Sequence, residues 1–144
     1  MSDYKRVITA ACSQEEAYVA ITHKMSEWWS QMSATFDNVG SRATVTFEGM
    51  KTYWSFEAIS LERPHLVVLK CIESHHIHLG QPDKILTEWL NTKLIFKIDA
   101  VDGGCQVEFT HEGLNQELVC FDVCENGWDH FIGESLRDYL QGRS

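Results

Sequence analysis

Residues 121–140 read FDVCENGWDHFIGESLRDYL, and this stretch decides the fold of the chain. Apolar side chains recur in it at steps of three and four residues, from Phe121 through Trp128 to Tyr139. Acidic side chains fill the positions between them, so one face of a helix would be apolar and the other charged. The sequence therefore predicts a long amphipathic C-terminal helix that must bury its apolar face against another element.

The chain before this helix alternates between apolar and polar residues with a period of two, which is typical of half-buried strands. The segments with strand character are 42–48, 52–61, 66–72, 86–99 and 105–112. Short turns such as Asp102-Gly103-Gly104 join neighbouring segments, so we expect an antiparallel sheet. Residues 74–85 carry the weakest pattern and are expected to form a loop.

The N-terminal part predicts one strand and two short helices. Residues 3–11 read as a strand, and Ser13 with Glu16 forms a capping box at the start of a helix that should run to about Lys24. Ser26 is placed to cap a second short helix. Two helices therefore separate the first strand from the rest of the sheet.

These elements together predict an α+β helix-grip fold. We expect a curved antiparallel β-sheet of about six or seven strands, wrapped around the long C-terminal α-helix, with the two short helices after the first strand. The length of 144 residues favours a single domain over 1–144. Since one helix cannot fill a curved sheet along its whole length, the fold predicts an apolar cavity between sheet and helix.

Charge and composition exclude several classes of function. The net charge is −9, and most of it falls within residues 98–144. Without a basic patch we expect no nucleic-acid partner, and no apolar run approaches the length of a membrane span. The N-terminus has no long apolar segment of a secretory signal, and the five cysteines have no framework spacing. We therefore expect a cytoplasmic protein with reduced thiols.

One ionisable residue is expected to face the cavity. His111 continues the inward face of its strand set by Val107 and Phe109, while Glu112 points the other way. Three interpretations stay open for His111: a structural histidine bonded within the core, a polar anchor for a ligand, and a general acid–base group. The sequence shows no partner with which the third role would work, and we assign no catalytic residue.

The ligand-binding residues are predicted from the inner faces of the strands and the C-terminal helix. They are mostly aromatic, as expected where the wall of a cavity is also the core. The predicted set is Trp28, Trp29, Trp54, Phe56, Phe96, Phe109, His111, Cys124, Trp128, Phe131 and Ser135.

Neither a metal site nor a cofactor site is predicted. His75, His76 and His78 form the most metal-like cluster, but only Asp83 lies near them as a further ligand, and zinc prefers four. We interpret the cluster as a polar loop. Cys120 and Cys124 have a spacing that suits neither a redox CxxC motif nor a disulfide within a helix.

The order of elements and several motifs resemble a known superfamily. The motifs are Phe109–Leu114 (FTHEGL), Cys120–Cys124 (CFDVC), Gly127-Trp128, Phe131-Ile132, Ser135-Leu136, Trp28-Trp29 and Thr52–Glu57 (TYWSFE). The chain resembles the START and birch-pollen-allergen superfamily, often called SRPBCC. More narrowly it is similar to the Aha-type branch, named after the activator of the ninety-kilodalton heat-shock protein's ATPase, and the similarity covers nearly the whole chain.

The resemblance implies a helix-grip fold with a hydrophobic cavity, but it does not imply one activity. The founding member carries a separate N-terminal region that engages the chaperone; this chain leaves no room for one, so chaperone activation is not expected. The first hypothesis is binding of a small apolar or amphipathic molecule without catalysis. A cyclase or hydrolase that uses His111 is the second, and a protein–protein role of the acidic helix face is the third. The sequence leaves a weak homodimer open.

Overall fold

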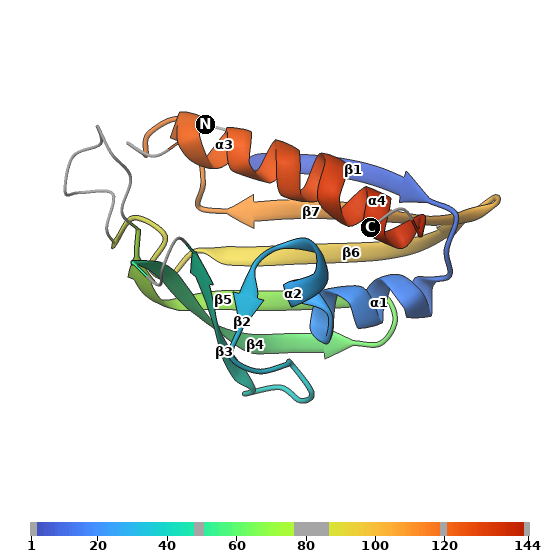
Figure 1. Cartoon of the computed structure of the whole chain (residues 1–144), viewed down its shortest axis with the longest axis horizontal. Coiled ribbons are helices and arrows are strands. Elements are labelled where there is room, and N and C mark those ends of the chain that lie inside the picture. The colour runs from blue at the N-terminus through green and yellow to red at the C-terminus, as the bar shows by residue number, and fades with distance from the viewer. Residues whose placement is uncertain (1–2, 48–50, 77–86, 119–120, 143–144) are drawn as a thin grey trace.

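The computed structural model describes residues 3–47, 51–76, 87–118 and 121–142. One antiparallel sheet forms a curved layer, and the C-terminal helix lies across one of its faces (Figure 1). The α+β helix-grip architecture predicted from the sequence is confirmed.

The sheet has seven strands within the described residues, in the order β1-β7-β6-β5-β4-β3-β2. All neighbours pair antiparallel, and the hairpin β6–β7 turns at Asp102-Gly103. The short strand β2, which pairs with β3, was not predicted. The strands are β1 (Tyr4–Ala10), β2 (Gln31–Met32), β3 (Arg42–Phe47), β4 (Thr52–Glu62), β5 (Leu66–His75), β6 (Lys93–Val101) and β7 (Gly104–Glu112).

Two helices follow β1, as predicted. Helix α1 (Gln14–Thr22) begins with the capping box, in which Ser13 Oγ accepts from the Glu16 amide and Glu16 accepts from the Ser13 amide. Helix α2 (Met25–Trp28) starts one residue before Ser26, so the prediction that Ser26 caps it is wrong. The reason is packing, since the buried side chain of Met25 already belongs to the helix.

Two boundaries in the second half of the sheet also differ from the prediction. Strand β5 continues to His75, so the expected loop begins later, and residues 77–85 of that loop lie outside the described residues. The predicted strand 86–99 begins only at Lys93. Residues 87–92 form tight turns instead, closed by Leu90 N–H to Thr87 O and by Thr92 N–H to Trp89 O. Hydrogen bonds of this turn to Cys71 hold it against the middle of β5.

The C-terminal helix is continuous but widens in its middle. It consists of α3 (Phe121–His130), a π-helical segment η2 (Phe131–Leu136) and α4 (Arg137–Leu140). Gly133 lies in the widened part, where a Cβ would come within 2.8 Å of the Arg6 guanidinium. Wide π turns of this kind are rare in proteins, and many of those that do occur lie at functional sites.

The sheet curls because β4 and β5 do not pair in one continuous register. Shifts occur between Ser55 and Phe56 and again between Ala58 and Ser60. Such bulges bend a strand and increase its twist, so they fold the edge with β3 and β2 towards the helix. No helix within the described residues has the length and apolar character required to cross a membrane.

Candidate functional site

A cavity of about 150 Å³ lies between the start of the C-terminal helix and the curled edge of the sheet. Strands β3 and β4, the end of β5, the turn before β6 and helix α3 all contribute to its wall. Its lining consists of Trp29, Phe47, Thr52, Trp54, His76, Trp89, Val123, Cys124, Gly127, Trp128 and Phe131.

The structure brings five of the eleven predicted ligand-binding residues to this cavity. They are Trp29, Trp54, Cys124, Trp128 and Phe131. The other six do not line the cavity and lie in the surrounding core or further along the C-terminal helix. These are Trp28, Phe56, Phe96, Phe109, His111 and Ser135. Inward orientation along a strand therefore predicted burial, but it did not separate the residues around a cavity from those beneath it.

Trp28 and Ser135 have structural partners that account for their positions. The Trp28 indole N–H donates to the Ala20 carbonyl at 2.8 Å, which ties α2 to α1. The Ser135 hydroxyl donates to the Trp28 carbonyl at 2.6 Å, which ties the C-terminal helix to α2. Ser135 therefore fixes the helix to the rest of the fold rather than facing the cavity.

Four of the eleven residues that line the cavity are tryptophans, and their rings contact one another. Trp54 and Trp89 stack with centroids 4.0 Å apart and planes at 17°, and Trp89 stacks on Trp128 at 5.7 Å and 15°. Trp29 also contacts Trp128, with ring centroids 5.0 Å apart and planes at 40°. Offset stacking of this kind contributes about 0.5–1.5 kcal/mol per pair beyond area burial. The wall is thus held by ring contacts as well as by the strands.

Trp89 is the main lining residue that the sequence prediction missed. It was placed in a strand, whereas it lies in the turn before β6 and is only 3% exposed. The sequence did contain a turn-forming residue, Asn91, two positions after Trp89. In the structure Asn91 adopts a φ of 70°, in the left-handed region that asparagine tolerates better than most residues other than glycine.

His111 lies behind this wall and is fully buried. Its Nδ1 accepts from the Trp128 indole N–H at 3.0 Å, so the proton of the neutral ring is on Nε2. Nε2–H donates to Thr92 Oγ1 at 2.8 Å, and that hydroxyl donates to the Trp89 carbonyl at 2.6 Å. The chain of three hydrogen bonds fixes the Trp128 indole and the backbone of Trp89, two residues that line the cavity.

The electrostatics of His111 agree with a structural role. Burial removes the ring from water and lowers its pKa to about 3. The ring is therefore neutral at physiological pH, which the hydrogen bond accepted from Trp128 requires. With both nitrogens bonded inside the core, His111 matches the structural interpretation and has no contact with the cavity space.

The remaining polar atoms of the wall are few. The Trp89 indole N–H donates to Cys124 Sγ at 3.2 Å, so this thiol serves as an acceptor within the wall. Trp54 Nε1 is buried and has no hydrogen-bond partner within the part of the chain that the structure describes. The lining of the cavity is therefore mainly apolar.

The histidine cluster divides at the end of β5. The His75 ring stacks on Tyr53 at 5.0 Å, whereas His76 packs on Trp54 at 4.9 Å and lines the cavity. His78 and Cys120 lie outside the described residues. No group of three or more metal-ligating side chains occurs among the residues that are described.

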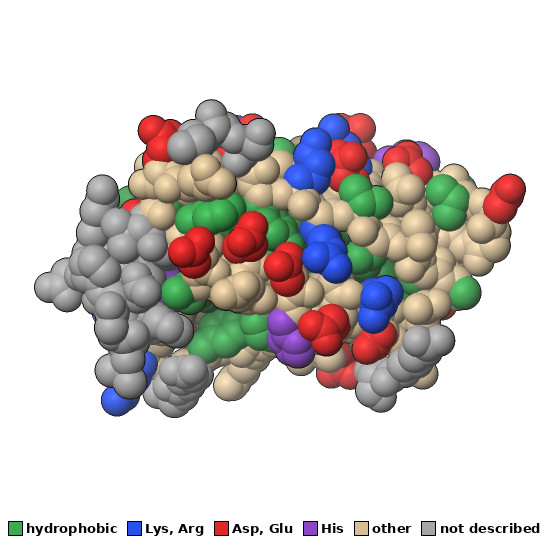
Figure 2. Space-filling model, turned by 90° about the horizontal axis from the view of Figure 1, so that it is seen from above, with side chains coloured by type: hydrophobic (Ala, Val, Ile, Leu, Met, Phe, Trp, Pro, Cys, Tyr) green, Lys and Arg blue, Asp and Glu red, His purple; other side chains and the backbone are tan. Residues whose placement is uncertain are grey.

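Acidic side chains follow the outer surface of the C-terminal helix, and Figure 2 shows them in a row between hydrophobic patches. Part of this face is used within the chain. Asp129 accepts a hydrogen bond from the Tyr4 hydroxyl at 2.7 Å and forms an ion pair with Arg6 at 3.3 Å. The role of the acidic face in binding a partner protein stays a prediction.

The chain is similar in structure to solved proteins over nearly its whole length. The Aha1 dimer from Colwellia psychrerythraea superposes with a TM-score of 0.78 at 23% identity, covering 100% of this chain and 99% of that one. Protein MLL2253 from Mesorhizobium loti gives 0.74 at 16% identity, covering 98% and 99%. DynU16, a putative protein in the dynemicin biosynthetic locus, gives 0.74 at 14% identity, covering 99% of this chain and 49% of that one.

No curated protein sequence matches the chain, but a family model agrees with these structural similarities. The model described as activator of Hsp90 ATPase homolog 1-like protein matches residues 11–141. The chain therefore belongs to the family of activator of Hsp90 ATPase homolog 1-like proteins, in the Aha-type branch of the SRPBCC superfamily.

Proposed function

We propose that the protein binds a small apolar or amphipathic molecule in the cavity between helix α3 and the curled edge of the sheet. The observation that carries the proposal is a cavity of about 150 Å³ lined mainly by aromatic side chains and open to solvent on one side. The rings that face this hollow lack the dispersion contacts that neighbouring atoms would supply there. A ligand would restore those contacts.

The size and lining of the cavity limit the ligand. Apolar cavities of about 150 Å³ bind molecules of the size of benzene, so the enclosed part of the ligand is one or two rings or a short aliphatic chain. Burial of that part would contribute about 25 cal/mol per Å² of apolar area. Any polar end of the ligand would extend towards the solvent at the mouth.

The position of His111 supports binding without catalysis by this residue. A general acid or base must come within hydrogen-bond reach of the reacting group. Both ring nitrogens of His111 are bonded to Thr92 and Trp128, and Trp128 stands between the ring and the cavity. In this proposal His111 positions the wall and does not touch the ligand.

Gly127 offers a direct test, because it lies on α3 and lines the cavity. A Cβ at this position would meet no atom within 4 Å. Replacement Gly127→Leu should fill the cavity and weaken binding of benzene or naphthalene roughly tenfold or more. Stability should hold or rise by up to about 1 kcal/mol, since leucine favours a helix more than glycine does.

Two measurements check this prediction. Titration of benzene and naphthalene is followed by amide and indole N–H chemical shifts in wild type, Gly127→Leu and the smaller control Gly127→Ala. Native mass spectrometry of freshly purified wild type then searches for a retained molecule that Gly127→Leu lacks. Equal affinities of wild type and a folded Gly127→Leu variant would place binding elsewhere.

We also propose a weak homodimer. Support comes from the Colwellia psychrerythraea Aha1, which shares the fold and was solved as a dimer. Sedimentation velocity over a hundredfold range of concentration should show a mean mass that rises from monomer towards dimer. A constant monomer mass up to the highest concentration would contradict this proposal and leave the binding proposal intact.

A further inference from the structure

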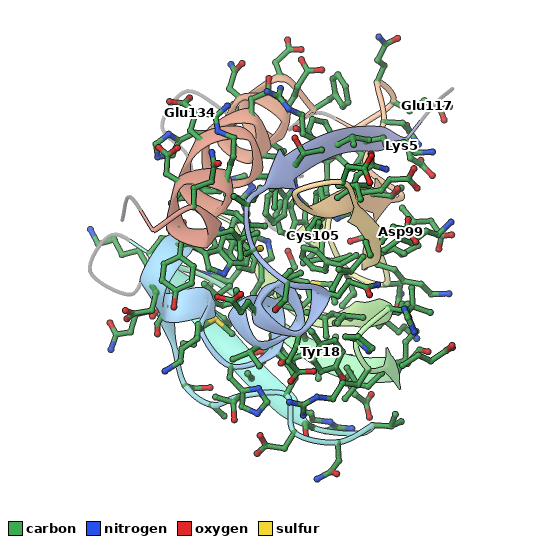
Figure 3. All side chains as sticks on the ribbon, turned by 90° about the vertical axis from the view of Figure 1, so that its right-hand side faces the viewer. Lys5, Tyr18, Asp99, Cys105, Glu117 and Glu134 are labelled. Carbon is green, nitrogen blue, oxygen red and sulfur yellow. The ribbon has the colours of Figure 1, made fainter. Side chains whose placement is uncertain are left out.

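Two cysteine side chains meet in the core away from the cavity. Cys12 Sγ and Cys105 Sγ are 3.2 Å apart, although the residues are 93 positions apart in the sequence. Cys12 is 8% exposed and Cys105 is fully buried. Figure 3 shows Cys105 inside the molecule, whereas the labelled charged residues lie around its outside.

A glycine allows this approach. Cys105 is the second residue of β7 and pairs with Ala10 at the end of β1, two residues before Cys12. A Cβ on Gly104 would overlap the Ala10 carbonyl and lie 3.0 Å from the Ala11 Cα. The chain that leaves β1 therefore passes directly over Gly104, and this close passage brings Cys12 onto Cys105.

The other described cysteines are placed differently. Cys71 donates its thiol hydrogen to the Glu73 carbonyl at 3.3 Å, and Cys124 accepts from the Trp89 indole. None of the four described cysteines is in a disulfide. Only Cys12 and Cys105, among the described residues, have their sulfur atoms in contact with each other.

We propose that Cys12 and Cys105 are a redox modification site that takes a peroxide as oxidant and closes to a disulfide. A disulfide has an S–S distance of about 2.05 Å, so the sulfurs must approach by roughly 1 Å. The site lies where β1 ends and β7 begins, the end of the sheet at which β5 also begins, whereas His76 and the cavity follow the far end of β5. The proposal is therefore independent of ligand binding.

The chemistry balances with hydrogen peroxide alone. Cys12, the more exposed thiol, attacks one peroxide oxygen, and the O–O bond breaks to give a sulfenic acid and one water. Cys105 sulfur then attacks Cys12 sulfur; the S–O bond breaks, and the thiol proton leaves with the hydroxide as a second water. Two thiols are oxidised by two electrons, and one peroxide is reduced to two waters.

The rate of this reaction should be low at neutral pH and should rise with pH. Burial and the neighbouring sulfur raise the pKa of Cys12 to about 12, and burial also raises that of Cys105. The thiolate is the reactive form, so the rate should increase about tenfold per pH unit between pH 7 and 9. A slow reaction with this dependence distinguishes the pair from an exposed, activated thiol.

Peptide mapping of the intact chain tests the proposal directly. Protein is treated with hydrogen peroxide, catalase removes the excess, and iodoacetamide blocks free thiols in denaturant. Cleavage after acidic residues releases Cys12 in peptide 4–15 and Cys105 in peptide 103–108. Neither peptide contains another cysteine. We expect these two peptides joined by a bond that dithiothreitol breaks, and a total of five thiols reduced to three.

Thermal unfolding gives the second readout. A bond between residues this far apart restricts the unfolded chain strongly, so the melting temperature should rise by roughly 10 °C and return after reduction. Cys12→Ser and Cys105→Ser should each lose this rise, whereas the control Cys71→Ser should keep it. If either serine variant fails to fold, the wild-type peptide map decides. Separate, over-oxidised or unmodified 4–15 and 103–108 peptides would overturn the proposal.

Discussion

Replacement of Trp128 by alanine is expected to lower the free energy of unfolding by about 3–5 kcal/mol, the usual cost of deleting a large buried ring. Trp128 is 2% exposed and packs on Trp29, Trp89 and Phe109 at centroid distances of 5.0, 5.7 and 4.6 Å. Its loss also removes the donor to His111 Nδ1, an atom of a side chain that is fully buried in the wild type. Urea unfolding followed by circular dichroism measures the change.

The variant Trp128→Phe separates packing from hydrogen bonding. It keeps an aromatic ring but removes the indole N–H that His111 accepts. We expect a loss of about 1–3 kcal/mol, smaller than for alanine, because an unpaired buried acceptor costs that much. If alanine and phenylalanine were equally destabilising, the hydrogen bond would dominate; a loss below 1 kcal/mol for alanine would contradict the packing shown by the structure.

Mild acid is expected to destabilise the protein through His111. Its pKa is about 3 in the folded state and about 6.5 in the unfolded chain. Between these values the unfolded state binds the extra proton, so the free energy of unfolding falls as pH falls and is level above about pH 7. From pH 7.5 to pH 5 this one group should account for a loss of about 2 kcal/mol.

A matched variant isolates this contribution from that of the carboxylates. His111→Gln keeps an N–H for Thr92 but has no group that titrates in this range. The variant should be less stable at pH 7.5 by about 1–3 kcal/mol, because Trp128 loses its acceptor. Its stability should nevertheless fall about 2 kcal/mol less than that of wild type on going to pH 5. Equal pH dependence in both proteins would show that folding does not shift the pKa of His111.

The fold was predictable because its signals are local and agree with one another. The three- and four-residue spacing through Trp128 specifies one helix, and alternation such as that of Val107, Phe109 and His111 specifies strands with one inner face. The capping box at Ser13 needs only residues close in sequence. Each pattern expresses the same requirement, that one face of the helix or strand is apolar and is buried away from water.

The candidate site was predictable only in part, because its shape depends on contacts between distant segments. Trp89 reaches the cavity through a turn whose backbone bonds to Cys71, and periodicity cannot show such a bond. Ser135 has the spacing of a lining residue, yet its hydroxyl binds the Trp28 carbonyl. Phe47 enters the lining because the bulged sheet curls towards the helix.

The sequence by itself determined which faces are buried, the order of the elements, the inward orientation of His111 and the family resemblance. These follow from side-chain period and from local capping, which act over a few residues. Only the tertiary structure decided that His111 supports the wall, that four tryptophans surround the open space, and that Cys12 meets Cys105. Those facts depend on register, bulges and the passage of one backbone over a glycine, and such close contacts exist only once the chain is packed.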